Sequence, residues 1–342
     1  MLRLNPILLL DLSKHWGNKV ELVPRKRLEL YSGRSHAQLA LEIAANLDVT
    51  LGNATLREFA DGEIHCRFGE SVRGKDIFII QTHSGPVNDS IMEQLIMIDA
   101  AKRASAKRIT AVCPYYGYSR QDRKASGREP ITAKLVADMM AVAGADRIIA
   151  LDLHSGQIQG FFDGPVDHLT AMPVLIDYLK QNADSETVIV APDAGRVKVA
   201  SRFSQVLNCD LAFVHKRRPR GTANTVEALD VVGEVEGRRC VIIDDMIDTA
   251  GTICAASDLL MSRGASEVWA MATHGLLSDP ATKRLNDSAI SRVVITNTLP
   301  LRHDRMIDKL EVLSVAPIIA QAIGAVFEDS SVSEIFGGEN LS

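Results

Sequence analysis

The sequence of 342 residues is poor in aromatic residues and carries no excess of positive charge. Aromatics make up 5% of the chain and the formal net charge is −5, so the chain as a whole lacks the stacking platforms and the cationic surface that nucleic-acid binding requires. Its early apolar run, residues 6–12, is interrupted by Asp11 and is too short to span a membrane. We therefore expect no nucleic-acid or membrane partner, and we interpret residues 1–26 as a peripheral extension.

Cysteine is also scarce. The five cysteines are odd in number and form no C-x-x-C pair, which argues against a disulfide framework and a structural zinc site. This usage fits a reducing cytoplasm, where we expect the protein to reside. Two nucleotide-binding motifs are missing as well. There is no G-x-x-x-x-G-K-[ST], which excludes a P-loop kinase, and no G-x-G-x-x-G after a strand, which excludes a dinucleotide site.

The rest of the composition is that of an ordinary globular protein, with 46% hydrophobic and 24% charged residues. At roughly 150 residues per domain, the length predicts about two domains. Short apolar runs predict strands at residues 77–80, 109–113, 148–151, 188–191, 211–214, 240–243, 268–272 and 293–296. The patterns between them predict helices at residues 35–47, 90–104, 132–143, 196–207, 252–263 and 315–327. This alternation predicts an α/β fold whose mostly parallel sheets are covered by helices on both faces.

The alternation also suggests a duplicated unit. An apolar strand runs into an acidic, glycine-containing loop in both halves, at residues 148–156 and 241–251. We expect a boundary near residues 167–173, with an N-terminal domain at 27–170 and a C-terminal domain at 171–335. In such sheets ligands bind outside the carboxyl ends of the strands, so we expect the ligand sites in the loops at those ends.

The most informative of these loops follows the strand that begins at Val241. That strand is expected to deliver two adjacent carboxylates, Asp244 and Asp245, to its end. The small residues after them allow a tight turn whose backbone N–H groups face a phosphate, and Thr252 is a suitable N-cap for the next helix. Carboxylates beside a phosphate site make sense for a sugar phosphate, because they accept hydrogen bonds from hydroxyls. The alternative is an acidic strand end followed by an ordinary capped helix.

Two further loops carry charge. Residues 152–167 offer one imidazole, that of His154, with three carboxylates, an oxygen-rich set that suits magnesium. A lone histidine is more often structural. Residues 216–221 place four cations in five positions at a strand exit, which suggests a loop that closes over phosphates, although a solvated face has the same pattern.

Two segments are less specific taken alone. Residues 118–124 have the mixed charge of a surface loop, and Phe59 in the segment 59–63 would be assigned to the core from its composition.

Together these segments resemble one family. The segment 241–252 resembles the ribose-phosphate-binding loop shared by type I phosphoribosyltransferases and ribose-phosphate diphosphokinases (PRPP synthetases). The segment 152–167 is similar to a signature of the diphosphokinases that the phosphoribosyltransferases lack. The resemblance spans roughly residues 28–337 and implies two similar phosphoribosyltransferase-like domains.

The resemblance also implies roles for individual residues. Ribose 5-phosphate would be bound by Arg218, Asp244, Asp245, Asp248, Thr249, Ala250, Gly251 and Thr252. ATP would be bound by Phe59, Asp61, Gly62, Glu63, Arg120 and Gln121, with the first four reaching into the site of a neighbouring subunit. Two Mg²⁺ ions would be held by His154 and Asp193, with Asp152 as a further candidate. Lys216 and Arg218 would stabilise the transferring diphosphate.

The implied reaction moves the terminal diphosphate of ATP onto the 1-hydroxyl of ribose 5-phosphate, giving PRPP and AMP for nucleotide biosynthesis. The family resemblance further implies a homohexamer activated by phosphate and inhibited by ADP, with Ser331 and Ser333 near a regulatory phosphate. A hydroxyl-rich terminal loop is the alternative for these two serines. The alternatives for the whole chain are a type I phosphoribosyltransferase and a non-catalytic regulatory subunit that kept the fold.

The sequence departs from the family pattern at two positions near these loops. Arg196 stands where many members have a second glycine after Pro-Asp-x-Gly, which affects the expected shape of the loop next to Asp193. Ala250 replaces a glycine common in the ribose-phosphate loop, and its small side chain leads us to expect little effect.

Overall fold

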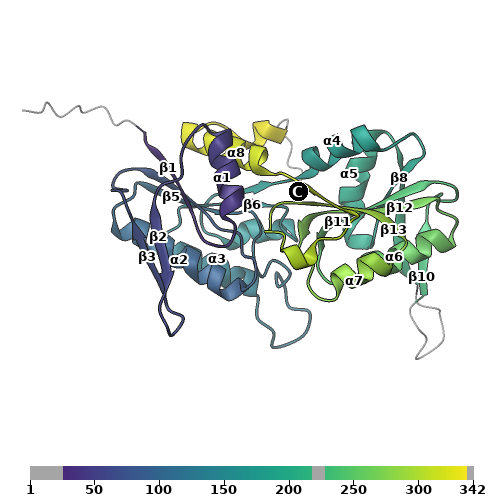
Figure 1. The fold of residues 1–342 in the computed structure, drawn as a ribbon, viewed down its shortest axis with the longest axis horizontal. Coiled ribbons are helices and arrows are strands. Elements are labelled where there is room, and N and C mark those ends of the chain that lie inside the picture. Colours follow the sequence, from purple (N-terminus) through teal and green to yellow (C-terminus); the bar gives the residue numbers. More distant parts are fainter. Residues whose placement is uncertain (1–25, 218–227, 337–342) are drawn as a thin grey trace, which may run out of the picture.

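The computed structural model describes residues 26–217 and 228–336 and contains two mostly parallel sheets that lie end to end (Figure 1). The N-terminal sheet is entirely parallel. In spatial order its strands are β1 (Leu28–Ser32), β4 (Asp76–Ile80), β5 (Arg108–Cys113), β6 (Arg147–Leu151) and β7 (Val166–Leu169). Its two faces are covered by the helices α2 (Val87–Arg103) and α3 (Thr132–Ala143) on one side and α1 (Ala37–Asn46) and α8 (Ala316–Glu328) on the other.

The second sheet is parallel except for one edge strand. In spatial order its strands are β10 (Ala228–Val232), β9 (Asp210–Arg217), β8 (Thr187–Ala191), β11 (Arg239–Ile247), β12 (Glu267–Gly275), β13 (Ile290–Thr296) and β14 (Leu310–Leu313). It is covered by α4 (Met172–Asn182) and α5 (Val197–Leu207) on one face and by α6 (Gly251–Ser262) and α7 (Ala281–Asp287) on the other. The predicted α/β class is therefore confirmed, and each predicted strand and helix is present.

Both sheets are buried on both faces, and the side chains of the central strands show why. In β4, Ile77 and Ile79 enter the core under α2 and α3, whereas Phe78 and Ile80 enter the core under α1 and α8. Successive side chains of a strand point to opposite faces, so a continuous apolar run is what two covered faces demand. The same alternation lets β11 supply both cores of the second sheet.

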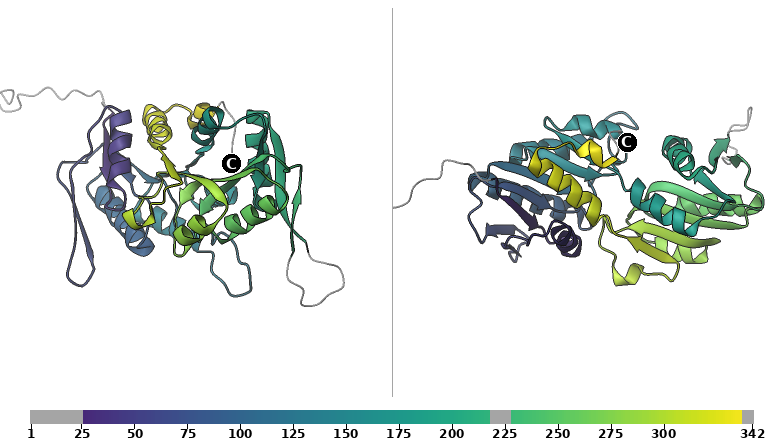
Figure 2. Two further views of the ribbon diagram at one scale, coloured as in Figure 1. Left: turned by 45° about the vertical axis from the view of Figure 1, so that its right-hand side comes forward. Right: turned by 90° about the horizontal axis from the view of Figure 1, so that it is seen from above.

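The last helix crosses back to the first half of the chain. α8 packs beside α1, with Ile319 and Ile323 in the same buried cluster as Leu39 and Ile43 (Figure 2). Just after α8, Asp329 accepts a hydrogen bond from Arg108 Nη1 at 2.6 Å. The range predicted for the C-terminal domain includes this helix, whose partners lie in the N-terminal half.

A two-stranded antiparallel hairpin, β2 (Ala54–Glu58) and β3 (Ile64–Phe68), stands apart from both sheets and projects from the body of the molecule (Figure 2). Its base is anchored by the tilted ring pair of Tyr31 and Phe68, with centroids 4.5 Å apart. Its tip carries the predicted ATP-binding segment 59–63.

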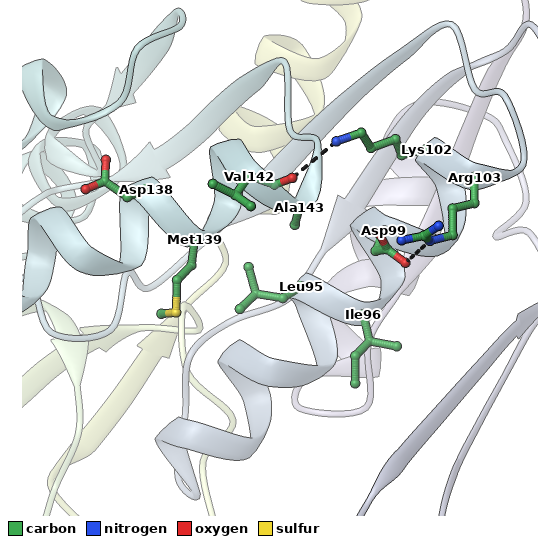
Figure 3. Close-up of a pocket in the computed structure, with 9 residues that line it drawn as sticks. All are labelled: Leu95, Ile96, Asp99, Lys102, Arg103, Asp138, Met139, Val142 and Ala143. Atoms are coloured by element: carbon green, nitrogen blue, oxygen red, sulfur yellow. Dashed lines mark hydrogen bonds and ion pairs between the residues drawn. The ribbon is translucent and has the colours of Figure 1, made fainter.

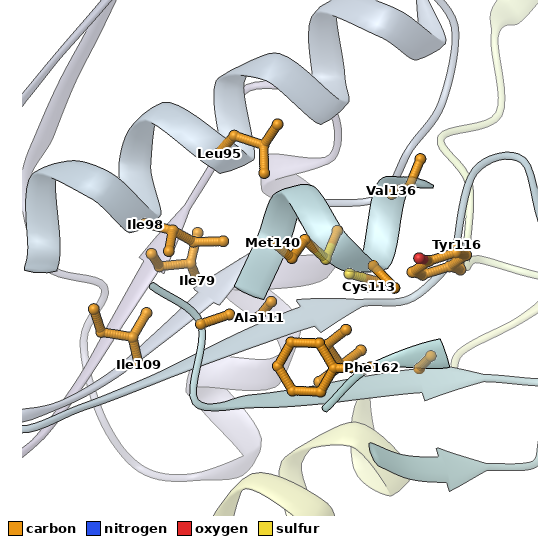
Figure 4. Close-up of a cluster of buried hydrophobic side chains, with 14 of the residues drawn as sticks. Ile79, Leu95, Ile98, Ile109, Ala111, Cys113, Tyr116, Val136, Met140 and Phe162 are labelled. Carbon is orange, nitrogen blue, oxygen red and sulfur yellow. The ribbon is translucent and has the colours of Figure 1, made fainter. Parts of the chain in front are cut away.

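The core between the first sheet and its helices α2 and α3 should dominate the stability of that half (Figure 4). Ile98 is fully buried there, so Ile98→Ala should lower the free energy of unfolding by about 2–5 kcal/mol through lost burial and a residual cavity. Val142→Ala on α3 is the matched control: this side chain is 79% exposed, and its change should stay within about 0.5 kcal/mol. Urea denaturation of both variants measures this, and equal losses would contradict the assignment of the core.

Candidate active site

Two adjacent carboxylates lie inside β11, near the centre of the second sheet. β11 continues to Ile247, so Asp244 and Asp245 do not end the strand as predicted, and Asp244 still lies opposite Ala272 of β12. On the other side, β8 pairs with β11 only through residues 239–242. The pair therefore extends past the end of β8, toward the loop that follows it.

That loop supplies a cation to the pair. A short 3₁₀ helix (Ala194–Arg196) begins after Asp193, whose Oδ1 accepts a hydrogen bond from the Gly195 N–H at 2.8 Å. Arg196 Nε then lies 3.1 Å from Asp244 Oδ1, and its Nη2 lies 2.7 Å from Asp245 Oδ1. The arginine that replaces the expected glycine thus points into the site.

His154 reaches the same carboxylates from the first half of the chain. Its Nδ1 lies 2.7 Å from Asp245 Oδ2, and Arg196 Nη2 approaches the same nitrogen at 3.1 Å. A proton on Nδ1 donated to the carboxylate satisfies the shorter of these contacts. The neutral tautomer with its proton on Nδ1 has a lone pair on Nε2, a form able to bind a metal.

Burial and mutual repulsion split the pKa values of the two carboxyls. Burial and the neighbouring charge of Asp245 raise the pKa of Asp244 to about 8. Burial also acts to raise the pKa of Asp245, but the hydrogen bond from His154 and the charge of Arg196 outweigh it and lower that pKa to about 2. At neutral pH the pair therefore holds one proton, with the negative charge on Asp245.

The small-residue loop after β11 forms a turn at the start of α6. Ala250 adopts a left-handed conformation with φ of +60° and precedes the first helical residue, Gly251. Thr252 is consequently not the N-cap predicted for it, because the helix begins one residue earlier and no side chain caps it. Arg284 of α7 donates from Nη1 to the carbonyl of Thr249 at 3.0 Å, a contact that no sequence motif indicated.

These elements enclose a cavity of about 240 Å³. The predicted site residues that line it are Arg120, His154, Asp193, Asp244, Asp245, Asp248, Thr249, Ala250, Gly251 and Thr252. Arg120 comes from the N-terminal half and bridges to Asp248 with an Nη1–Oδ2 distance of 2.6 Å. The structure thus brings together the residues predicted to bind the sugar and the metal, and it adds Arg120 from those predicted to bind the nucleotide. A neighbouring cavity of about 440 Å³ shares His154, Arg196 and both aspartates.

Other predicted residues lie elsewhere. The segment 59–63 sits at the tip of the hairpin, where Phe59 is 49% exposed and not a core residue. Gln121 accepts a hydrogen bond from Thr132 Oγ1 at the start of α3. Ser331 and Ser333 are exposed and hydrogen-bond to each other beyond α8. The backbone of Lys216 belongs to the end of β9, and Arg218 lies outside the described residues.

Asp152 ties the two halves together. Its Oδ2 accepts hydrogen bonds from the Ala171 N–H at 2.8 Å and from Thr273 Oγ1 at 2.6 Å. Its carbonyl oxygen lies 3.1 Å from Nε2 of His274 on β12. One carboxylate oxygen of this metal candidate is therefore already committed to holding β6 against the second sheet.

A larger hollow lies far from these groups, in the groove between α2 and α3 (Figure 3). Its volume is about 710 Å³, and it is lined by Leu95, Ile96, Asp99, Lys102, Arg103, Asp138, Met139, Val142 and Ala143. It contains no predicted site residue.

Three expectations about other kinds of site can be compared with the structure. All five cysteines are free in the structure. Within residues 26–217 and 228–336, no group of three or more histidine, cysteine or acidic side chains is arranged to hold a metal. No helix in the same ranges is long and apolar enough to cross a bilayer.

Comparisons with known proteins identify similar chains. Residues 28–144 match the family described as the N-terminal domain of ribose phosphate pyrophosphokinase, and residues 216–337 match the phosphoribosyl synthetase-associated domain. The ribose-phosphate pyrophosphokinase of Streptomyces coelicolor is 54% identical over 93% of this chain and 98% of its own. The ribose-phosphate pyrophosphokinase of Corynebacterium glutamicum is 51% identical over 96% of this chain and 100% of its own. The crystal structure of phosphoribosylpyrophosphate synthetase from Mycobacterium smegmatis, 52% identical, superposes with a TM-score of 0.85 over 89% of this chain and 100% of that one.

The shared proton of the acidic pair predicts a pH dependence. The pKa of Asp244 is raised from 3.8 to about 8 in the folded protein, so its contribution to stability is complete below 3.8 and is lost as the pH rises toward 8. Asp244→Asn should therefore make the free energy of unfolding fall less steeply across this range. Urea denaturation with a metal chelator present measures it. Asp258→Asn on the exposed face of α6 is the control, and an unchanged slope in Asp244→Asn would contradict the prediction.

Proposed function

This chain belongs to the ribose-phosphate pyrophosphokinase family, a family of diphosphotransferases, and we propose that it transfers the terminal diphosphate of ATP to the 1-hydroxyl of ribose 5-phosphate, giving PRPP and AMP. The observation that carries this proposal is the single cavity lined by His154, Asp193, the acidic pair and the 248–252 loop. A sugar phosphate and a metal-bound triphosphate need these groups within reach of one another.

The sugar would lie between the acidic pair and the turn before α6. Backbone N–H groups at the start of this 12-residue helix suit the 5-phosphate, because they lack partners within the helix and lie at its positive end. Asp245, which is ionised, accepts hydrogen bonds from ribose hydroxyls. Asp244, which keeps its proton at neutral pH, is able to donate one as well as accept.

Magnesium fits two further groups that line this cavity, His154 and Asp193. Mg²⁺ binds oxygen ligands, keeps several of its waters and uses few protein groups, so a site without three clustered side chains is compatible with it. His154 would hold one ion and Asp193 a second, because the contact with Asp245 engages Nδ1 of the imidazole and not Nε2, and the Gly195 N–H engages only Oδ1 of Asp193. When bound, the ion would neutralise charge on the phosphates of ATP.

The chain's own residues would act by position and charge. The ribose 1-hydroxyl oxygen bonds to the β-phosphorus in line as the bond from this phosphorus to the α–β bridging oxygen breaks. AMP leaves with that oxygen from the opposite side, and the hydroxyl proton passes to solvent, so no side chain is required as a general base. Phosphoryl-type transfer depends mainly on alignment and on stabilising the charge that spreads over the transferring group. Arg120 and Gln121 would position the nucleotide, and Lys216 and Arg218 would meet that charge.

The remaining elements of the proposal concern assembly and regulation. Phe59 and the acidic residues beside it stand on a projecting hairpin, which suits a contribution to a neighbouring subunit of a homohexamer. Activation by phosphate, inhibition by ADP, a role for Ser331 and Ser333 and a cytoplasmic location stay predictions.

One assay tests the reaction directly. Incubating the protein with ATP, magnesium and ribose 5-phosphate should release AMP and form PRPP, and omitting the sugar phosphate should abolish AMP release. A phosphoribosyltransferase would instead consume PRPP together with a base. Failure to produce AMP in a folded, metal-supplied sample would favour a non-catalytic subunit and refute the proposal.

The role of Lys216 has its own test. Lys216→Ala should lower turnover by about 10²–10³, the loss expected when one preorganised donor to transition-state charge is removed. Steady-state kinetics at saturating ATP and ribose 5-phosphate measures this. Lys180→Ala on α4 is the control, because this exposed lysine lines neither of the two cavities that contain the acidic pair. Normal turnover in a folded Lys216→Ala protein would remove Lys216 from the mechanism.

A further inference from the structure

Arg196 lies between two adjacent carboxylates and an imidazole. Two adjacent carboxylates beside an imidazole are a typical set of ligands for a metal ion. Here the space between them holds a guanidinium, which contacts Asp244 at 3.1 Å, Asp245 at 2.7 Å and the imidazole of His154 at 3.1 Å. The arginine side chain is only 15% exposed, so its charge is matched by these partners more than by solvent.

Three of the four oxygens of the pair already accept a contact, and a carboxylate oxygen can still accept a further hydrogen bond from a sugar hydroxyl. Asp245 accepts from Arg196 on Oδ1 and from His154 on Oδ2, each at 2.7 Å. Asp244 Oδ1 accepts from Arg196 and from the backbone N–H of Asp245 at 2.8 Å. A metal ion approaching the pair would have to displace the guanidinium.

We propose that Arg196 is a built-in counter-ion that keeps divalent metal off the Asp244–Asp245 pair and so reserves these carboxyls for the sugar. The metal is thereby directed to other groups that line the cavity, His154 Nε2 and Asp193. The arginine is a positioning residue in this scheme, because it acts on the ligands through the carboxylates. The identity of the metal in this scheme rests on the proposed function. The contacts of Arg196 with the two carboxylates do not depend on it.

The backbone holds the arginine in place for this role. Arg196 ends the 3₁₀ helix that begins after Asp193, so the metal candidate and the counter-ion are three residues apart on one short turn. Arg196 also lines both adjoining cavities, together with the two aspartates. Removing the guanidinium should therefore open a cation site at the pair without moving Asp193.

Binding of Mn²⁺, followed by electron paramagnetic resonance in the absence of nucleotide and sugar, tests this proposal. Arg196→Ala should bind one more Mn²⁺ per chain than the wild type, or bind it at least about tenfold more tightly. Mn²⁺ should also raise the melting temperature of this variant more than that of the wild type. Adding Asp245→Asn to Arg196→Ala should cancel the gain, since it removes a ligand of the new site.

Matched variants separate this outcome from general effects of losing an arginine. Arg305→Ala removes a side chain of similar exposure, 14%, that pairs with Asp279, and it should leave Mn²⁺ binding as in the wild type. Arg196→Lys keeps the positive charge and should show no gain. Arg196→Gln, which keeps most of the length, should show the gain and provides the test if Arg196→Ala fails to fold.

Equal Mn²⁺ binding by the wild type and by a folded neutral variant at position 196 would overturn the proposal. This result is independent of the reaction, because it is measured without substrates. A wild-type protein that releases no AMP while Arg196→Ala still gains a Mn²⁺ site would refute the proposed function and leave the counter-ion role intact.

Discussion

The repulsion between Asp244 and Asp245 is the constraint from which the rest of the site follows. Buried carboxylates persist only if they are paired, hydrogen-bonded or protonated, since desolvation penalises an isolated charge heavily. The protein uses all three solutions: Arg196 pairs with both groups, His154 donates to Asp245, and a raised pKa keeps Asp244 protonated. The loop after β8 and the loop after β6 are consequently fixed against the same strand.

A polar seam between the two sheets makes this convergence possible. Asp152 joins β6 to Thr273 and His274, and Thr82 Oγ1 donates to the carbonyl of Thr298 at 2.6 Å. Burial lowers the pKa of His274, which keeps this imidazole neutral at the seam. Because each bond links residues far apart in the sequence, the carboxyl ends of the two sheets are held face to face. His154 can reach Asp245 only because of this arrangement.

The sequence predicted the parts of the structure that have strong periodicity. Apolar strands such as β4 are evident from the sequence because both of their faces are buried. Amphipathic helices such as α3 are evident because one broad stripe of the helix is buried. The hairpin and the edge strand β14 were missed because short, half-exposed strands lack that signal. The contact of Arg196 with the acidic pair was not predictable from its position in the sequence. It depends on the register of two strands, because β8 stops pairing with β11 at residue 242 and the loop after β8 then lies beside the pair. The cap at Ala250 was missed because alanine does not signal a left-handed turn.

The cavity that holds the acidic pair is poor in aromatic side chains. Among the described residues that line it, His154 carries the only ring, and the other side chains are charged, polar or aliphatic. Such a wall suits phosphates, hydroxyls and a metal, but it offers no flat apolar surface for a purine. Phe59, by contrast, is exposed on a hairpin that projects from the body, with Arg57 positioned over its ring. On the proposed function, the nucleotide base therefore needs a surface from outside this cavity, and the hairpin of a second copy is the part of the chain shaped to provide it.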